Sequence, residues 1–143
     1  MFGFSKLTDY GLVILAEMAK NPGRRFSAGE ASRNTGLPRA TVRKVMGILA
    51  AAGILGSNRG TGGGYFLSRP PEEITLANLV EAMEGKPALV ECATSDQPDC
   101  RIALTCAIRS GLQVINRSVI ETLDRFNVAQ LTETAANGPA TTR

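Results

Sequence analysis

Five glycines and one arginine lie within the thirteen residues GSNRGTGGGYFLS at positions 56–68. Glycine adopts positive φ angles without strain and permits the close approach of another backbone. Ile54 and Leu55 precede the stretch and residues 65–67 return it to apolar character, which predicts a hairpin with a glycine-rich tip. The run lacks the lysine and the Ser/Thr that close a phosphate-binding loop, and a strand follows where such a loop needs a helix. We therefore expect a hairpin and not a nucleotide-binding loop.

Three helices are predicted upstream of the hairpin. Residues 8–20 place apolar side chains at helical spacing, with Thr8 as the N-cap. A short helix follows, with Ser27 as its N-cap and Gly36 as its stop signal, and a third helix begins at Pro38. Two helices joined by a glycine-containing turn indicate a helix-turn-helix, and the hairpin is in the place of its wing. The predicted fold is mainly α, a winged helix-turn-helix with a two-stranded wing.

The charges are distributed unevenly along a chain whose formal net charge is only +3. Residues 20–69 carry nine Lys/Arg and the single acid Glu30, whereas residues 70–143 carry six bases and ten acids. So much positive charge in one half is repulsive without a polyanionic partner, which favours nucleic acid binding. The alternative is a basic face that only water contacts.

Two parts of this basic half are suited to double-stranded DNA. Helix-turn-helix proteins place the N-terminal residues of the second helix in the major groove, where arginine pairs with guanine and lysine contacts phosphates. This predicts DNA contacts from Arg39, Thr41, Arg43 and Lys44. At the hairpin tip, Arg59 with Gly60 beside it would enter a narrow minor groove, whose negative potential attracts arginine.

The three cysteines form a second group of candidate functional residues. Cys92, Cys100 and Cys106 lie within fifteen residues, and the chain contains no histidine. An odd number of cysteines without secretory context argues against a disulfide framework. Three thiolates fit an iron–sulfur cluster, redox-active thiols or incidental apolar residues, while a structural zinc site would need a fourth Cys or His ligand. We expect no enzyme and no small-molecule substrate, because a cysteine nucleophile has no histidine base here.

The last part of the chain predicts a short helix at about 75–84 and a long helix from about 99 to 133. The long helix carries apolar residues at alternating spacings of three and four, namely Leu112, Ile115, Val119, Leu123 and Phe126. This face is too large for one small domain, so we expect a dimerisation helix, the alternative being a helix that folds back on the core. The expected organisation is a DNA-binding domain at 1–85, a cysteine-bearing loop at 86–107, the dimerisation helix at 108–133 and a disordered tail at 134–143.

No membrane segment is expected. The apolar stretch GLVILAEMA is interrupted by Glu17 and lacks both the charged flank and the cleavage site of a signal peptide. We therefore expect a cytoplasmic protein with no membrane partner.

Taken together, these motifs resemble the iron–sulfur-sensing winged-helix regulators of the IscR, NsrR and RirA type. The resemblance rests on SKLTDYGLVILAEMA, on the wing RGTGGGYFLSRPPEEITLANLVEAMEG and on the cysteine pattern EC-x7-C-x5-C, and it covers residues 1 to about 130. Within that group the N-terminal motif is most similar to regulators of the Suf cluster-assembly operon. The resemblance implies a homodimer with a cluster on the three cysteines of each subunit, a recognition helix that uses Pro38, Ala40, Thr41, Arg43 and Lys44, and Arg59 in the minor groove.

The fourth cluster ligand is where the sequence departs from part of this group. IscR-type members use a histidine three residues after the last cysteine, and Arg109 stands at that position. NsrR-type members use an aspartate of the first helix from the other subunit, and Asp9 occupies the matching place, so it is the candidate fourth ligand or else an ordinary acid of a first helical turn. The cluster type, [2Fe-2S] or [4Fe-4S], is left open.

The resemblance implies a homodimeric repressor whose affinity for a DNA operator responds to an iron–sulfur cluster. Genes for iron–sulfur cluster assembly or iron homeostasis would be its targets. The alternative is a metal-free winged-helix regulator in which the cysteines form a thiol redox switch.

Overall fold

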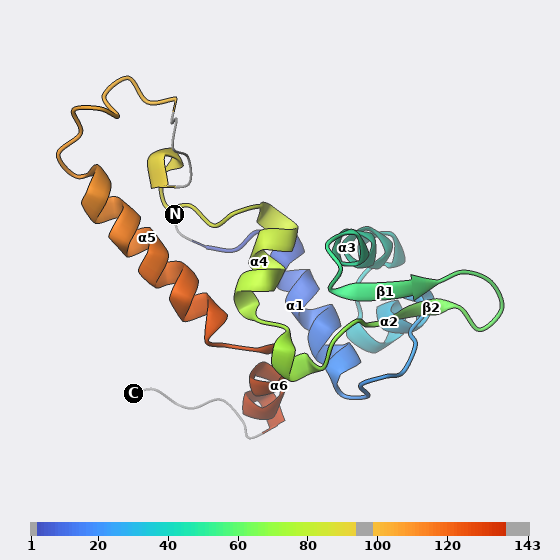
Figure 1. Ribbon diagram of the computed structural model, residues 1–143. Helices are drawn as coiled ribbons and strands as arrows, with labels where there is room; N and C mark the ends of the chain where they lie inside the picture. Colours follow the sequence, from blue (N-terminus) through green and yellow to red (C-terminus); the bar gives the residue numbers. More distant parts are fainter. Residues whose placement is uncertain (1–2, 94–98, 137–143) are drawn as a thin grey trace.

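The computed structural model describes residues 3–93 and 99–136, and Figure 1 shows the path of the chain. Within these residues the fold is mainly helical with one antiparallel hairpin, as predicted. The elements in chain order are α1 (Lys6–Ala19), α2 (Ala28–Thr35), α3 (Arg39–Ala51), β1 (Leu55–Asn58), β2 (Gly64–Leu67), the 3₁₀ turn η1 (Pro71–Glu73), α4 (Leu76–Glu84), the 3₁₀ turn η2 (Glu91–Ala93), α5 (Arg109–Asp124) and α6 (Val128–Ala136).

Helix α1 begins earlier than its sequence pattern predicts. Ser5 is the N-cap, and its Oγ accepts a hydrogen bond from the backbone N–H of Thr8 at 3.3 Å. The predicted cap, Thr8, is instead fully buried, and its hydroxyl donates to Oε1 of Glu84 at the end of α4, 2.5 Å away. The prediction of Thr8 as N-cap is therefore wrong, because a partner 76 positions away uses the hydroxyl.

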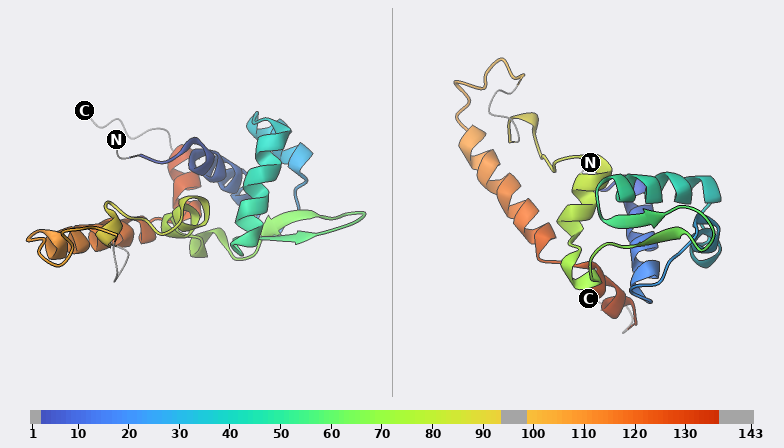
Figure 2. Two further views of the ribbon diagram at one scale, coloured as in Figure 1. Left: turned by 90° about the horizontal axis from the view of Figure 1, so that it is seen from above. Right: turned by 45° about the vertical axis from the view of Figure 1, so that its right-hand side comes forward.

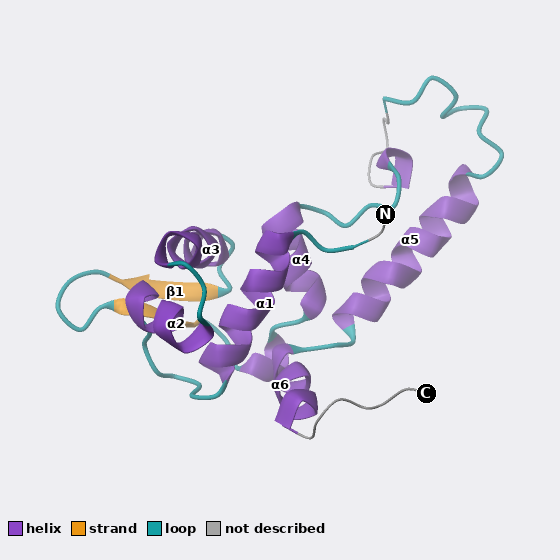
Figure 3. Cartoon of the chain, turned by 180° about the vertical axis from the view of Figure 1, so that it is seen from behind, coloured by secondary structure: helices purple, strands orange, loops and turns teal. Residues whose placement is uncertain are grey.

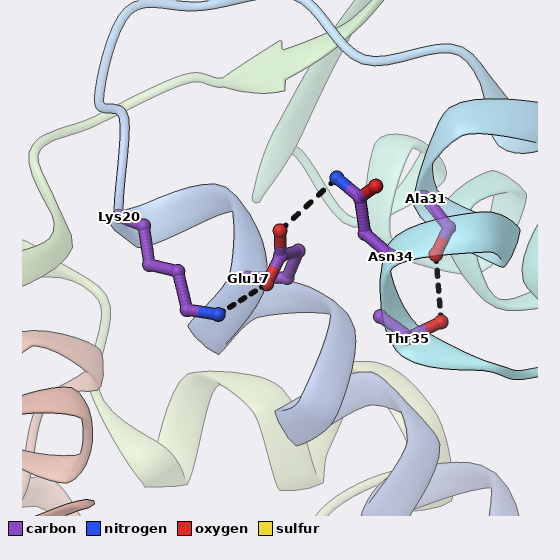
Figure 4. A network of polar contacts seen from close by, with 5 residues as sticks. All are labelled: Glu17, Lys20, Ala31, Asn34 and Thr35. Carbon is purple, nitrogen blue, oxygen red and sulfur yellow. Dashed lines mark hydrogen bonds and ion pairs between the residues drawn. The ribbon is translucent and has the colours of Figure 1, made fainter. Parts of the chain in front are cut away.

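The caps of α2 are those expected from the sequence. Ser27 Oγ accepts from the backbone N–H of Glu30 at 3.0 Å, and Gly36 ends the helix in the left-handed region with φ of 74°. Figure 4 shows how α2 is attached to α1: Glu17 accepts from Lys20 Nζ at 2.5 Å and from Asn34 Nδ2 at 3.1 Å. Within α2, Thr35 Oγ1 donates to the carbonyl of Ala31 at 2.7 Å (Figure 4).

The hydrophobic core lies between α1, α3, α4 and the base of the hairpin. Each of its fully buried side chains contributes about 1.5–3 kcal/mol by leaving water. The core residues are Ile14, Leu15, Met18, Phe26, Ala31, Val42, Val45, Met46, Leu49, Ile54, Leu55, Ile74, Leu79 and Val128. This packing fixes α3 and the hairpin relative to each other, which matters for any surface that both of them form.

The C-terminal third contains two helices where the sequence pattern predicts one. Helix α5 begins at Arg109 and ends at Asp124, and the chain then turns at residues 125–127. At this turn the backbone pairs with the start of α4: Leu76 N–H donates to the carbonyl of Phe126 at 2.8 Å, and Val128 N–H donates to the carbonyl of Ile74 at 2.9 Å. The prediction of one long helix from about 99 to 133 is wrong, because the helix begins only at Arg109 and this long-range pairing interrupts it after Asp124.

Helix α6 folds back on the core, which is the alternative that the sequence left open. Val128 is 2% exposed, and α6 packs against α1. The helix extends to Ala136, so the first three residues of the predicted tail are helical, and residues 137–143 lie outside the described part of the chain.

Helix α5 extends away from the body of the molecule, as Figures 1 and 2 show. It packs against α4 and η2. Several large apolar side chains on α5 or directly before it are exposed, among them Ile108, Val114 and Ile115 at 64%, 63% and 52%. Helices α2 and α3 and the hairpin lie at the opposite end (Figure 3). Among the described helices, none combines the length and the hydropathy that a membrane span requires.

Candidate nucleic-acid interface and cysteine loop

The N-terminal half of α3 presents one polar face to solvent. Pro38, Arg39, Ala40, Arg43 and Lys44 are exposed and Thr41 is half-buried, while the opposite face of the helix packs into the core. Exposed and buried residues alternate along α3 because residues three and four positions apart lie on the same face of a helix. The six residues predicted to contact DNA therefore lie together at the end of the helix that enters a major groove in helix-turn-helix proteins.

The hairpin has the predicted strands and tip. Strands β1 and β2 pair antiparallel, with Leu55 opposite Leu67 and Asn58 opposite Gly64. Arg59 and Gly60 are exposed at the tip, where Gly60 and Gly62 have φ of 94° and 74°. Residues with a Cβ rarely adopt such angles, which explains the glycine content of the tip.

Gly64 is needed for a different reason, the approach of another segment. The backbone of Tyr65 exchanges two hydrogen bonds of 2.8 Å with that of Phe26, in the loop that precedes α2. A Cβ at position 64 would lie 2.8 Å from the carbonyl oxygen of Phe26. This contact joins the wing to the helix-turn-helix, so that the tip and α3 belong to one rigid unit.

Arg25 holds the wing tip and was not among the residues predicted from the sequence. Its Nη1 donates to the carbonyl of Gly62 at 3.2 Å. With the amide of Asn58 turned so that its oxygen faces the guanidinium, Asn58 accepts from Nη2 of Arg25 at 3.1 Å. The sequence offers only the position of Arg25, directly before a buried aromatic residue, as a signal for this role.

The neighbouring Arg24 is engaged within its own loop. Its guanidinium lies 5.0 Å from the ring centroid of Phe26 and pairs with the carboxylate of Glu30. The Glu30 side chain therefore serves an ion pair, while its backbone N–H donates to the Ser27 cap.

All nine cations of residues 20–69 are exposed, and they belong to the segment that runs from the end of α1 through α2 and α3 to the end of the hairpin. They are Lys20, Arg24, Arg25, Arg33, Arg39, Arg43, Lys44, Arg59 and Arg69. Because the acids are concentrated in the second half of the sequence, this segment forms the basic pole that a DNA backbone would contact.

The three cysteines are free thiols near the opposite end. Cys92 in η2 and Cys106 before α5 are half-buried, and Cys100 is exposed. Asp9 lies exposed in the first turn of α1. Across residues 3–93 and 99–136 there is no group of three or more Cys, Asp or Glu side chains close enough to hold a metal ion. The four predicted ligands are thus not gathered within one chain in this conformation.

The donor set nevertheless has the right chemistry for an iron–sulfur cluster. Thiolates are the usual ligands of such clusters, and three of them lie on one loop and at its junction with α5. A cluster on these residues requires the loop to close around it. If Asp9 is the fourth ligand, it would be the Asp9 on α1 of a second copy. The residues fit the group in type, and the loop must rearrange to bind it.

A polar contact between the buried Thr8 and the exposed Glu84 joins the start of α1 to the end of α4, directly before the cysteine loop. Glu84 Oε1 accepts from the hydroxyl of Thr8 at 2.5 Å and from the backbone N–H of Ser5 at 2.7 Å. The hydrogen bond from Thr8, followed by that from Ser5, holds the pKa of Glu84 below its ordinary value of 4.5. This contact fixes the first turn of α1, which carries Asp9, to the base of the loop.

Comparison with known proteins decides the family. Residues 4–134 match Rrf2, described as an iron-dependent transcriptional regulator. The chain belongs to the Rrf2 family. It is therefore a DNA-binding transcriptional regulator, and the resemblance to IscR-, NsrR- and RirA-type proteins is confirmed at this level.

Three relatives of this Rrf2 protein are 22% to 28% identical to it. Protein aau3 of Rhizobium meliloti (strain 1021) is 28% identical over 127 residues, which cover 89% of this chain and 82% of that protein. The structure of CymR (YrzC), described as the global cysteine regulator of B. subtilis, has a TM-score of 0.70 and 28% identity, covering 93% of this chain and 98% of that one. T. potens IscR has a TM-score of 0.70 at 22% identity, covering 98% and 93%, and shows the fold alone.

Proposed function

We propose that this Rrf2 protein is a homodimeric repressor whose affinity for a DNA operator is set by an iron–sulfur cluster on Cys92, Cys100 and Cys106. The observation that carries the proposal is the position of these thiols: all three lie on the segment between α4 and α5, on a chain whose far end is a basic winged helix-turn-helix. The family description as iron-dependent supports a metal-responsive role.

Recognition of DNA follows from the two exposed elements at the basic pole. The N-terminal end of α3, residues 38–44, enters a major groove, and the wing tip with Arg59 and Gly60 enters the adjacent minor groove. Since the core fixes α3 to the wing, both contacts form together. The half-sites of a dimer then lie one helical turn apart, or a multiple of one turn, in a pseudo-palindromic operator.

The exposed apolar side of α5 is the proposed dimer contact. Val114 and Ile115 of α5 and Ile108, which directly precedes the helix, are more than half exposed on a part of the chain that extends from the body of the monomer. Exposed apolar side chains in such a row are typical of an interface, and a second copy of α5 offers a matching surface across a two-fold axis.

When bound, the cluster supplies iron–thiolate bonds that are sensitive to oxidants and to iron supply. Cys92, Cys100 and Cys106 would hold it, with Asp9 of a second copy as the proposed fourth ligand. Because these cysteines lie in η2, on the loop and just before α5, their binding to the cluster would restrain the loop between η2 and α5. The restrained loop would in turn restrain the orientation of α5. Genes of iron–sulfur cluster assembly, the Suf operon among them, or of iron homeostasis are the proposed targets.

A thiol redox switch without metal is the second candidate. It is favoured by the exposure of Cys100 and by the dispersed positions of the thiols, and also by the 28% identity to CymR, whose description names it a cysteine regulator. Oxidation of an exposed thiol to a sulfenic acid or a disulfide would then act on the same loop.

The visible absorption spectrum of protein purified without oxygen distinguishes the two candidates. The cluster predicts broad charge-transfer bands, together with iron and sulfide in the protein, that Cys92→Ala abolishes. Thr105→Ala is the matched control, because the exposed Thr105 lies beside Cys106, and within the described residues its hydroxyl hydrogen-bonds only to the carbonyl of Ile102, at 3.4 Å. The redox switch would be established instead if the wild type is colourless, takes up no iron or sulfide, and changes its operator binding when Cys100 is oxidised.

A further inference from the structure

Asn116 is the one buried residue of α5 within the described structure, and it is polar. Its side chain is 5% exposed, whereas the neighbouring side chains of the helix are half-buried or exposed. Burying an amide without hydrogen bonds costs about 1–3 kcal/mol, so a buried asparagine indicates that particular partners are being held.

The partners of Asn116 lie on the segment that leads to Cys92. Asn116 Oδ1 accepts from the backbone N–H of Leu89 at 2.9 Å, and Asn116 Nδ2 donates to the carbonyl of Pro87 at 3.3 Å. One turn earlier on α5, Gln113 Nε2 donates to the carbonyl of Cys92 at 3.5 Å. Two amides on one side of α5 thus hold the backbone of residues 87–92 along the helix.

The other end of α5 is attached to the beginning of α4. Thr75 Oγ1 donates to Asp124 Oδ1 at 2.9 Å, next to the backbone pairing of residues 126–128 with residues 74–76. Because the segment with Cys92 leaves from the end of α4, helix α5 is bound to both ends of α4, and α4 packs against α1 and α3. Cys92 is therefore connected through α5 and α4 to α3, the proposed recognition helix, whereas Cys100 is exposed on the loop.

We propose that Asn116, assisted by Gln113, is a positioning residue that holds Cys92 on α5 and couples the state of the cysteine loop to α4 and α3. The anchoring of Cys92 stands on the hydrogen bonds alone. The effect on DNA affinity rests on the proposed function.

The anchoring is tested in metal-free, reduced protein by the rate at which N-ethylmaleimide alkylates Cys92. A background with Cys100→Ala and Cys106→Ala leaves Cys92 as the single thiol. Asn116→Leu keeps the branched shape of the side chain, enlarges it slightly and removes both hydrogen bonds, so it is expected to raise the alkylation rate roughly fivefold or more. Asn116→Asp keeps the acceptor for Leu89 and should raise it less. Ser118→Ala is the control on the same helix, since Ser118 is exposed and its hydroxyl contacts only its own helix.

Gln113→Leu gives an independent variant if Asn116→Leu does not fold. It removes only the contact to the carbonyl of Cys92 and is expected to raise the alkylation rate about twofold, in keeping with a long, weak hydrogen bond. Alkylation rates equal to that of Ser118→Ala in both variants would overturn the anchoring.

The coupling is tested with all three cysteines present, by the ratio of operator affinities with and without the cluster. Asn116→Leu should move this ratio toward one, and an unchanged ratio would overturn the coupling. A wild-type protein that takes up no cluster would overturn the proposed function, and the alkylation rates would still decide the anchoring of Cys92.

Discussion

At the scale of single residues, the sequence could not predict the role of a side chain whose hydrogen-bond partner lies far away in the chain. Thr8 has the pattern of an N-cap, but its hydroxyl serves Glu84, and Arg25 reaches the carbonyl of Gly62 at a separation of 37 positions. Arg59 and the cations of α3 were predicted because basic residues at a helix N-terminus and in a glycine-rich tip form local patterns. Asn116 carries no local signal of its role.

Arg59→Ala is expected to weaken operator binding roughly tenfold and to reduce the slope of log affinity against log salt by about one, because one cationic contact is lost. Fluorescence anisotropy over a salt series measures both quantities. Arg117→Ala, which removes an exposed cation of α5 outside the basic pole, is the control. An affinity and a slope that match this control would exclude the wing tip from the interface.

Arg25→Ala should weaken operator binding by allowing the wing tip to move, even if its guanidinium makes no DNA contact. If Arg25 acts by holding the tip, the double variant with Arg59→Ala will bind about as weakly as Arg59→Ala alone. Anisotropy titrations of both single variants and the double variant measure the coupling. Additive losses would instead indicate that Arg25 contacts DNA separately.

Glu84 gives stability a predictable dependence on pH. Its pKa is lowered in the folded protein, so its contribution is present above the ordinary value of 4.5 and is lost as the pH falls through the folded pKa. Glu84→Gln should therefore be less stable than wild type near neutral pH, and the difference should shrink with acid. Thermal unfolding at several pH values measures it, with Glu81→Gln, an exposed neighbour on α4, as the control. A difference that stays constant down to the acid limb would contradict the assignment.

At the scale of elements, helices and hairpin were predictable wherever a local period or cap defines them. Gly36 ends α2 and the capping box of Thr75 and Asn78 begins α4, and both signals lie within a few residues of the boundary that they set. The break between α5 and α6 was not predictable, because it depends on the pairing of residues 126–128 with residues 74–76. The gathering of the cysteines is likewise a property of the loop conformation, which their spacing does not determine.

Gly64→Ala tests whether the wing depends on close contact with the loop before α2. The new Cβ would lie 2.8 Å from the carbonyl of Phe26, on a backbone with φ of 152°, and we expect a loss of about 1–3 kcal/mol in unfolding free energy. Operator affinity should fall as the wing detaches. Gly111→Ala on α5, where nothing lies within 4 Å, should be neutral or slightly stabilising in chemical denaturation. Equal stabilities for the two variants would contradict the close contact.

At the scale of the whole molecule, the two opposite ends of the structure carry different kinds of residues. The basic pole carries α3 and the wing, and the opposite end carries α5, its exposed apolar residues and the cysteines (Figures 1 and 2). A second copy joined through α5 would leave both basic poles free. Operator binding should then require the dimer.

Ile115→Glu is expected to yield a folded monomer, because it places a carboxylate in the proposed apolar contact without touching the core. Analytical ultracentrifugation measures the mass, and anisotropy should show operator affinity falling by at least about tenfold as the two half-sites become independent. Arg117→Glu introduces the same carboxylate at an exposed, already polar position of α5 and should remain dimeric. A dimeric Ile115→Glu protein would remove this side of α5 from the interface.

The return of α6 to the core also has a consequence for biosynthesis. Val128, near the C-terminal end of the described residues, packs in the same core as Ile14 and Leu15 of α1. The backbone of residues 126–128 is hydrogen-bonded to that of residues 74–76. A nascent chain released only as far as the wing would expose that part of the core to solvent and to other chains. The DNA-binding end should therefore acquire its full stability only after α6 has left the ribosome, although every residue proposed to contact the operator is synthesised long before.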